Sequence, residues 1–282
     1  MSEERLTLRS SGIETTIKAH GAELCSLKDA QGNELIWQAG TAWPRHAPLL
    51  FPIVGRLKND QLRHQGATYP MTQHGFARDQ LFEWGERDTT ACSLTLRDSA
   101  VTRAHYPFAF RLAVTYRLQA ADLDVTLAIT NTGDEMLPAS IGAHPAFNWP
   151  LVEGVAKESY RLTFSDQEPG PIRRLKDGLM RAKSEPSPIR GKTLALSEPL
   201  FDDDAIILDR LASRAVGLAA NRDRRSMCPG SDFASWESGR SLAGRHFFAS
   251  SRGVALRARP ISTANLPTSP ASCRLRQAQA RF

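Results

Sequence analysis

Residues 110–131 read FRLAVTYRLQAADLDVTLAITN, and this stretch decides the fold class of the chain. From Phe110 to Leu118 a large apolar residue occupies every second position, and the same period of two returns from Leu123 to Ile129. Strict alternation is typical of strands that bury one face. The short link between the two runs makes them neighbours in an antiparallel hairpin. The stretch therefore predicts a sheet with one face on the core.

Similar short runs flank this hairpin on both sides, separated by turn-rich pieces. No amphipathic helix longer than about three turns is evident. Many strands with long loops predict an all-β fold, a large antiparallel sandwich in one domain over residues 5–221. The further strand candidates are residues 13–19, 22–27, 34–38, 92–97, 159–164, 193–196, 205–208 and 214–219.

The charge of the 282-residue chain is uneven. Its formal net charge is +6, but residues 221–282 hold eleven Arg and no Lys against Asp223, Asp232 and Glu237. This segment therefore carries +8 and the rest of the chain −2. A basic arm that binds nucleic acid or lipid is one interpretation; a tail without function is the other. Nucleic-acid binding needs aromatic residues interleaved with the arginines, and no such pattern is present, so we expect no nucleic-acid partner.

The start of the chain has no basic and apolar pattern of a signal peptide. The longest apolar stretch, residues 47–54, contains two prolines, so no segment is expected to span a membrane. Four scattered cysteines show neither a CxxC pair nor zinc-ligand spacing. These features predict a cytoplasmic protein with reduced cysteines.

Polar side chains capable of catalysis gather in three loops, at residues 48–59, 73–78 and 141–149. His74 precedes a glycine, which lets a backbone or a ligand approach closely. Arg56 could bind a hydroxyl group or an anion. Taken singly, His74 is better explained as a structural histidine in a turn and Arg56 as a solvated loop arginine.

His144 is the third such residue. Pro145 after it favours extended backbone at a strand end, and Phe147 and Trp149 follow closely. A rigid histidine beside aromatic faces suits a sugar pocket, because aromatic rings cover the C–H face of a sugar while polar groups bind its hydroxyls. By itself, however, His144 would more often be structural.

The acidic run at 202–204 suggests a cation site, but a solvated turn explains it equally well. It lacks the spaced oxygen ligands of a calcium loop, so we expect no metal. The sequence also contains no phosphate-binding glycine loop, nucleophile elbow or zinc motif.

Taken together, the three loops give the chain a clear resemblance to the aldose 1-epimerase family, the galactose mutarotase-like proteins. The resemblance covers about residues 10 to 220, and its motifs occur in the family's order. The matching stretches are 21–24 (GAEL) with 35–37 (LIW), 50–56 (LFPIVGR), 74–78 (HGFAR), 144–148 (HPAFN) and 200–205 (LFDDDA).

The resemblance implies a β-supersandwich that interconverts the α and β anomers of free aldoses, with a small sugar as its partner and no cofactor. It implies that His144 protonates the ring oxygen and that His74 hydrogen-bonds the same region. Arg56, Asp203 and Phe147 are implied to bind the sugar. A histidine titrates near neutral pH and suits the acid's role. A sugar-phosphate mutarotase and a non-catalytic sugar-binding protein remain alternatives, and the oligomeric state, monomer or dimer, is open.

One family feature is missing. The family's general base is a glutamate in an Ile-Glu-Pro-Trp-like segment near the C-terminus, and this chain has no such segment. Only Asp232 and Glu237 are acidic after residue 223, and neither has that context. The chain as written should therefore have negligible activity.

The arginine-rich tail resembles a gene read out of frame. A shifted codon consists of the third base of one codon and the first two bases of the next. When the shifted codons are read from Ala234 and Ser235 onward, a permitted choice of codons encodes QLGIWSKPGGPAFLCIEPWRGFA. This contains the missing motif, with its glutamate encoded across the codons of Ser250 and Ser251. We infer a frameshift, in the gene or in its sequencing, between about residues 221 and 233. Residues 222–282 are then expected to form an aberrant, poorly ordered tail with few strands.

Overall fold

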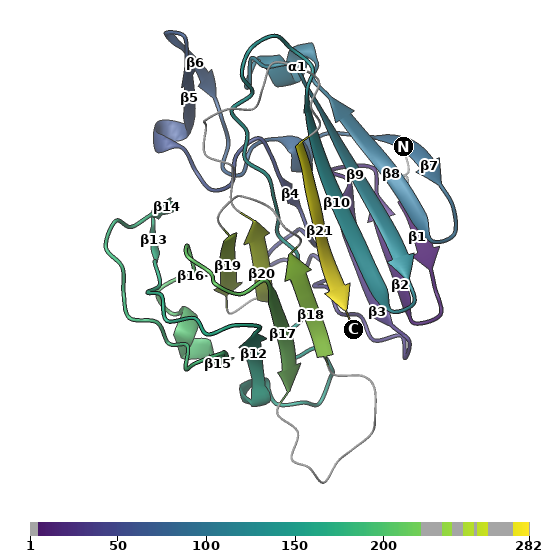
Figure 1. Ribbon diagram of the computed structural model, residues 1–282, viewed down its shortest axis with the longest axis vertical. Coiled ribbons are helices and arrows are strands. Elements are labelled where there is room, and N and C mark those ends of the chain that lie inside the picture. The colour runs from purple at the N-terminus through teal and green to yellow at the C-terminus, as the bar shows by residue number, and fades with distance from the viewer. Residues whose placement is uncertain (1–4, 221–232, 239–244, 251–252, 259–272, 282) are drawn as a thin grey trace.

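The computed structural model describes residues 5–220 in full, and the backbone alone of residues 233–238, 245–250, 253–258 and 273–281 (Figure 1). Strands are by far the main regular element of the described parts, as predicted. One short helix, α1 (Ala100–Arg103), and 3₁₀ turns at Lys58–Asp60, Ala77–Asp79, Lys157–Ser159 and Glu198–Phe201 are the helical elements among them. The strands are β1 Arg5–Arg9, β2 Ile13–Lys18, β3 Glu23–Asp29, β4 Leu49–Leu50, β5 Gln61–His64, β6 Ala67–Pro70, β7 Glu83–Arg87, β8 Ala91–Arg97, β9 Phe110–Gln119, β10 Asp122–Asn131, β11 Gly142–Ala143, β12 Tyr160–Phe164, β13 Leu175–Lys176, β14 Leu179–Met180, β15 Thr193–Ala195, β16 Ile206–Ile207, β17 Ala215–Ala220, β18 Phe233–Ser238, β19 Arg245–Ser250, β20 Gly253–Ala258 and β21 Cys273–Arg281.

The largest sheet has nine strands in the order β15-β12-β17-β18-β21-β10-β9-β8-β7. Its β9–β10 hairpin confirms the prediction from sequence, with Asp122 opposite Gln119 and Asn131 opposite Phe110. On β9, Phe110, Leu112, Val114, Tyr116 and Leu118 are all buried. The alternation of apolar residues in the sequence thus corresponds to the buried face of the sheet.

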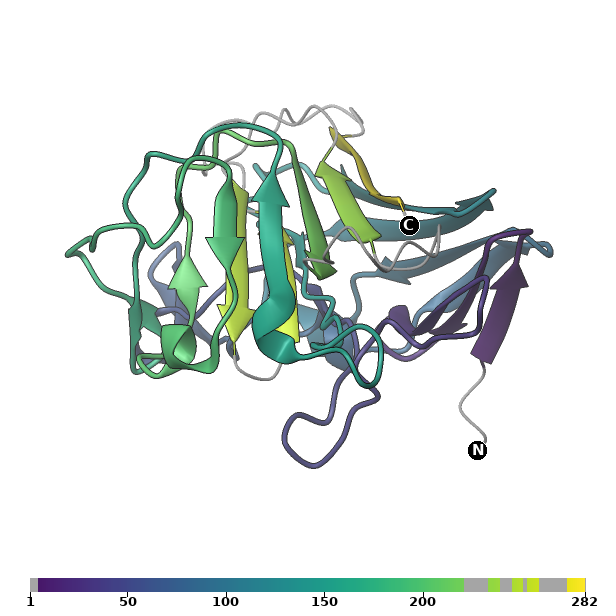
Figure 2. The same cartoon turned by 90° about the horizontal axis from the view of Figure 1, so that it is seen from below.

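A second sheet, β1-β2-β3, lies against the part of the large sheet formed by β7 to β10 (Figure 2). The Tyr116 hydroxyl on β9 donates a 2.7 Å hydrogen bond to the carbonyl of Ala22, just before β3. Arg9 N–H at the end of β1 donates to Thr89 O, between β7 and β8. Two sheets packed face to face form the sandwich that the sequence predicts.

The expected strand at 34–38 is wrong. This segment makes only isolated bridges, between Glu34 and Lys28 and between Ile36 and Phe147. The reason is the Glu34 carboxylate, whose Oε1 accepts from the N–H groups of Leu27 and Ile36 at 2.9 and 3.0 Å. A side chain therefore takes hydrogen bonds that a continuous ladder would have made.

Beyond residue 220 the backbone forms strands at four places, where the sequence predicts few. β18 and β21 lie between β17 and β10, so they join the two halves of the large sheet, and β19 and β20 form a smaller sheet with β16 (Figure 1). Side chains of this segment, and all of residues 221–232, 239–244, 251–252 and 259–272, lie outside the described part of the chain. The expected poor order and low apolar burial of the tail stay predictions.

Within the described residues, no helix is both long and apolar enough to cross a membrane. The cytoplasmic location expected from the sequence stays a prediction.

Candidate active site

A pair of two-residue strands positions His144. On β11, Gly142 and Ala143 pair with Leu50 and Leu49 of β4. The antiparallel contact continues past the strand end, because His144 N–H donates to Pro48 O at 3.0 Å. The histidine is therefore fixed by its own backbone, at a strand end as the sequence predicts.

A buried carboxylate holds the segment just before β4, with which the backbone of His144 pairs. Glu23 on β3 is 3% exposed, and its Oε1 accepts from the N–H groups of His46 and Ala47 at 2.8 and 3.0 Å. Its Oε2 lies 3.0 Å from Lys18 Nζ. The carbonyl of His46 in turn accepts from Ala146 N–H. Glu23 thus anchors the segment on which the His144 loop rests, a role that the sequence analysis missed although the residue stands in the GAEL stretch.

His74 lies in a tight and strained turn. Its φ is +70°, in the left-handed region that residues other than glycine seldom adopt, and Gly75 follows at +72°. A Cβ on Gly75 would lie 2.2 Å from Phe51 O, so only glycine fits there. This geometry brings the His74 loop against the backbone of Phe51. Phe76 N–H donates a hydrogen bond to Phe51 O.

Two hydrogen bonds join His74 to the loop that carries Arg56. His74 N–H donates to Gly55 O at 2.7 Å, and Gly55 N–H donates to His74 Nδ1 at 3.0 Å. Because Nδ1 accepts, the proton of the neutral imidazole is on Nε2. His74 is therefore set to present an N–H donor rather than an acceptor.

The two histidines come together. Their ring centroids lie 6.2 Å apart, with the planes inclined at 60°. The Trp43 ring lies 5.2 Å from the ring of His144, measured between centroids. His74 is mostly buried, at 7% exposed. The sequence analysis did not select Trp43, which lies between the matching stretches; no period or motif marks it.

Arg56 follows Gly55, the residue that is hydrogen-bonded to His74. Its guanidinium is already paired with other groups of the protein. It forms a two-pronged pair with Asp60, at 2.7 Å from Nε to Oδ1 and 2.6 Å from Nη2 to Oδ2. Its Nη1 also donates to Asp177 O in the β13–β14 turn, at 3.2 Å. Hydrogen bonding to Asp60 raises the pKa of Arg56, and the same contact lowers the pKa of Asp60. The predicted role of Arg56 in holding a sugar hydroxyl stays a prediction.

Asp203 and Phe147 are placed differently from the histidines. Asp203 is exposed and pairs with Arg181, with oxygen–nitrogen distances of 3.2 and 3.3 Å. Phe147 is 6% exposed within the hydrophobic core and bridges Ile36. The Trp43 ring is an aromatic contact of His144 that the sequence did not indicate. Sugar binding by Asp203 and Phe147 stays a prediction.

Arg78, the last residue of the HGFAR stretch, supports the His74 loop from below. Its Nη2 donates to Gln73 O at 2.7 Å, and its Nε lies 3.6 Å from Asp79 Oδ2. Burial, with Arg45 nearby, lowers the pKa of Arg78. The hydrogen bond from Arg78 to Gln73 O holds the loop at the residue before His74.

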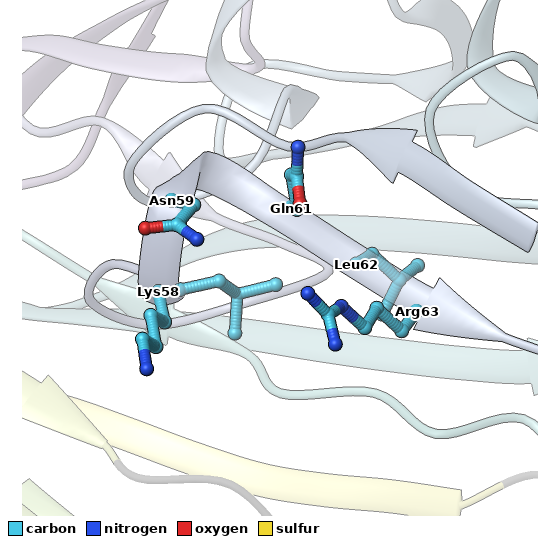
Figure 3. Close-up of a pocket in the computed structure, with 6 residues that line it drawn as sticks. Lys58, Asn59, Gln61, Leu62 and Arg63 are labelled. Carbon is cyan, nitrogen blue, oxygen red and sulfur yellow. The ribbon is translucent and has the colours of Figure 1, made fainter.

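The residues that follow Arg56 in the sequence line a cavity of about 410 Å³ (Figure 3). It is lined by Lys58, Asn59, Gln61, Arg63 and the apolar side chains of Leu57 and Leu62. Two cations and two amides make this concavity suited to an anionic or hydroxylated group.

The smaller sheet of the tail borders the site at the level of the backbone. β20 lies against β11, the strand that ends at His144. β19, its neighbour, ends at Ser250, one of the two residues whose codons together encode the missing glutamate in the shifted frame.

Comparison with known proteins agrees with these features. The family model described as aldose 1-epimerase matches residues 4–228. The plasmid-borne protein LacX of Lactococcus lactis subsp. lactis is 34% identical over 232 residues, which is 79% of this chain and 78% of that protein. A galactose mutarotase related enzyme from Lactobacillus acidophilus superposes with a TM-score of 0.81 and 28% identity, covering 99% of this chain and 97% of that one. A galactose mutarotase-like protein from Lactobacillus casei gives 0.79 and 28%, covering 99% of both chains.

The described sandwich is thus the galactose mutarotase-like fold that the sequence motifs imply. Because the family model matches most of its length, and a relative is 34% identical over more than three quarters of both proteins, the chain belongs to the aldose 1-epimerase family.

Proposed function

We propose that this protein is a sugar mutarotase by descent, which interconverts the α and β anomers of an aldohexose when its general base is present. The observation that supports this best is the approach of the His74 and His144 rings to 6.2 Å, on loops fixed by their backbones. Two imidazoles at this distance can both reach the atoms around one hemiacetal carbon.

The proposed reaction needs two proton transfers. A base removes the proton of the anomeric hydroxyl while His144, as imidazolium, gives a proton to the ring oxygen, and the bond from C1 to that oxygen breaks. The product is the open-chain aldehyde. Rotation about the C1–C2 bond and the reverse transfers close the other anomer. His74 donates its Nε2–H to an oxygen of the sugar and fixes the orientation of the ring.

The base is the part that the written sequence lacks. In the restored frame, the glutamate would directly follow β19, and the neighbouring strand β20 lies against the strand that ends at His144. The approach of β20 to β11 is what supports a carboxylate from this small sheet as the base that works with His144. The location supports both the frameshift and the assignment of the base.

Polarimetry of freshly dissolved α-glucose and α-galactose tests the proposal. The chain as written should leave the rate of mutarotation near that of the buffer, because loss of one member of an acid–base pair costs roughly 10²–10⁴-fold. A rate typical of an efficient mutarotase from the written chain would show that another residue acts as base. Resequencing the gene around the codon of Met227 tests the frameshift directly.

Two alternatives have observations in their favour. A non-catalytic sugar-binding protein fits the missing glutamate. A mutarotase of sugar phosphates fits the cavity beside Arg56, where Lys58 and Arg63 could hold a phosphate (Figure 3). Calorimetric titration with glucose, galactose and glucose 6-phosphate distinguishes them, because only the last alternative requires tighter binding of the phosphate ester, reduced by Arg63→Gln.

A further inference from the structure

Outside the proposed sugar site, one cluster of side chains combines a carboxylate, a thiol and an imidazole. Glu23 and Cys25 lie on β3, and His46 lies in the segment before β4. One potential ligand atom from each of the three lies within 4.8 Å of the other two. Glu23 is 3% and Cys25 2% exposed, while His46 is partly exposed and leaves an approach from the surface.

A second observation concerns His46 itself. Its Nδ1 is buried and has no hydrogen-bond partner among the described residues. A buried imidazole nitrogen without a partner is costly, because it has lost its water without replacement. The backbone of His46 is held by Glu23 Oε1, so the ring stays close to the cluster.

We propose that Glu23, Cys25 and His46 form a binding site for a divalent transition-metal ion, of which Zn²⁺ fits best. Thiolate sulfur, imidazole nitrogen and carboxylate oxygen are the three ligand types that zinc takes, with bonds of about 2.0–2.3 Å. In a tetrahedral site such ligands lie roughly 3.5 Å apart, so the side chains must close in by about an ångström. Water takes the fourth position.

The spacing hides this site from sequence inspection. Two ligands lie two residues apart on one strand, and the third follows 21 residues later across a loop. Cys25 lies where the pairing of β3 with β2 shifts register, between Leu24 opposite Ile17 and Ser26 opposite Thr16, and its ligand atom still lies close to that of Glu23.

Lys18 competes with the ion. Its ammonium lies 3.0 Å from Glu23 Oε2 and supplies the positive charge that a metal would replace. Binding therefore displaces Lys18, and it releases a proton from Cys25, since only the thiolate is a metal ligand. Lys18 makes the site weaker and gives the proposal a distinctive test.

Titration of the full chain with Co²⁺, a spectroscopic stand-in for Zn²⁺, tests the proposal, and Zn²⁺ is then added to displace it. A cobalt–thiolate site gives a charge-transfer band in the near ultraviolet, which Zn²⁺ should abolish. We expect this band in the wild-type chain and in the matched control Cys92→Ser, where another buried cysteine is changed. Cys25→Ser should lose it.

Two further variants keep the test informative if Cys25→Ser does not fold. His46→Gln should weaken Co²⁺ binding by at least the roughly 10–100-fold that loss of an outer partner costs. Lys18→Gln should strengthen it at least about tenfold, because a neighbouring positive charge is removed. A double variant, Cys228→Ser with Cys273→Ser, should keep the band.

The proposal is overturned by any of three results: no thiolate band in the wild-type chain, a band that survives in folded Cys25→Ser, or an affinity that neither His46→Gln nor Lys18→Gln changes. None of these measurements depends on mutarotase activity.

Discussion

The two sides of the proposed sugar site are secured in different ways. On the histidine side, formed by His74 and His144 with their loops, the backbone is tied by short hydrogen bonds to Gly55 and Pro48 and by the buried Glu23. On the side of the small sheet, β20 lies against β11, and β19 pairs with β20 and with β16. Almost any sequence can form backbone hydrogen bonds between strands, whereas only particular residues can act in catalysis. The comparison predicts that the β19–β20 side can keep its strand pairing even if the proposed loss of the base glutamate has removed its chemistry.

Restoring the reading frame should change the β19–β20 side of the site more than any other change. With the Ile-Glu-Pro-Trp segment back, mutarotation of α-galactose should rise by about 10²–10⁴-fold over the written chain. Polarimetry gives the rate. As a control, a restored chain whose new glutamate is replaced by glutamine should stay near the buffer rate while recovering solubility. If the restored chain is as inactive as the written one, the frameshift does not explain the missing base.

His144→Gln is the next test, made in both backgrounds. In the restored chain it should lower kcat by roughly 10²–10⁴-fold, because glutamine cannot give a proton to the ring oxygen. In the written chain it should change nothing measurable. His105→Gln is the matched control, since that exposed ring is bonded to Pro70 O elsewhere on the surface. Equal losses from both substitutions would contradict the role of His144.

Glu23→Gln tests what secures the histidine side. Glutamine keeps an oxygen for the N–H groups of His46 and Ala47 but leaves the Lys18 ammonium without its anion. Breaking a buried ion pair costs about 3–5 kcal/mol of unfolding free energy. The control Glu14→Gln removes a surface pair with Arg9 and should cost about 1 kcal/mol or less. Urea unfolding of the restored chain measures both, and similar small losses would show that Glu23 is not an anchor.

Gly75→Ala and Gly32→Ala separate steric contact from backbone strain. Both glycines have positive φ, at +72° and +83°. A Cβ would meet Phe51 O at 2.2 Å in the first case and nothing within 4 Å in the second. Each variant should lose about 1–2 kcal/mol from φ alone, and Gly75→Ala roughly 1–3 kcal/mol more from the clash. Equal unfolding free energies would mean that the turn relaxes.

Cys92 offers the smallest expected effect, in the sheet far from the tail's smaller sheet. Burial raises the pKa of its thiol from 9.0 to about 12. The unfolded chain then ionises near pH 9 while the folded chain stays neutral, so stability falls as the pH rises from about 9 towards 12. Cys92→Ala should flatten this part of the pH profile of unfolding free energy. In the native chain at pH 8, thiol reagents should leave Cys92 unlabelled; rapid labelling would contradict its burial.

Much of the fold was open to prediction because the relevant signals are local. The alternation in 110–131 marks a buried face directly, and it corresponds to β9 and β10. The segment 34–38 shows the limit, since its pattern is apolar but the Glu34 carboxylate takes the hydrogen bonds of a strand. That competition depends on where a side chain points after folding, and no period in the sequence records it.

The candidate site also has residues that the sequence reveals and residues that it does not. His74 and His144 stand in motifs, and the structure brings their rings together. Trp43 and Glu23 contribute through contacts between segments about 20 to 100 residues apart, so spacing alone does not reveal them. Arg56 was selected by its motif, but its pairing with Asp60 follows from the turn at Lys58–Asp60, which has no recognisable signal in the sequence.

The hydrogen bond from Gly55 N–H to His74 Nδ1 has a consequence for acidic conditions. A proton added to that nitrogen would face the N–H that now points at it, and the two would repel each other. The Gly55 loop and the His74 loop would then have to part, carrying Arg56 away from the histidines. Acid would thus act on this site as a mechanical release of two loops, in the same step that adds a charge to His74.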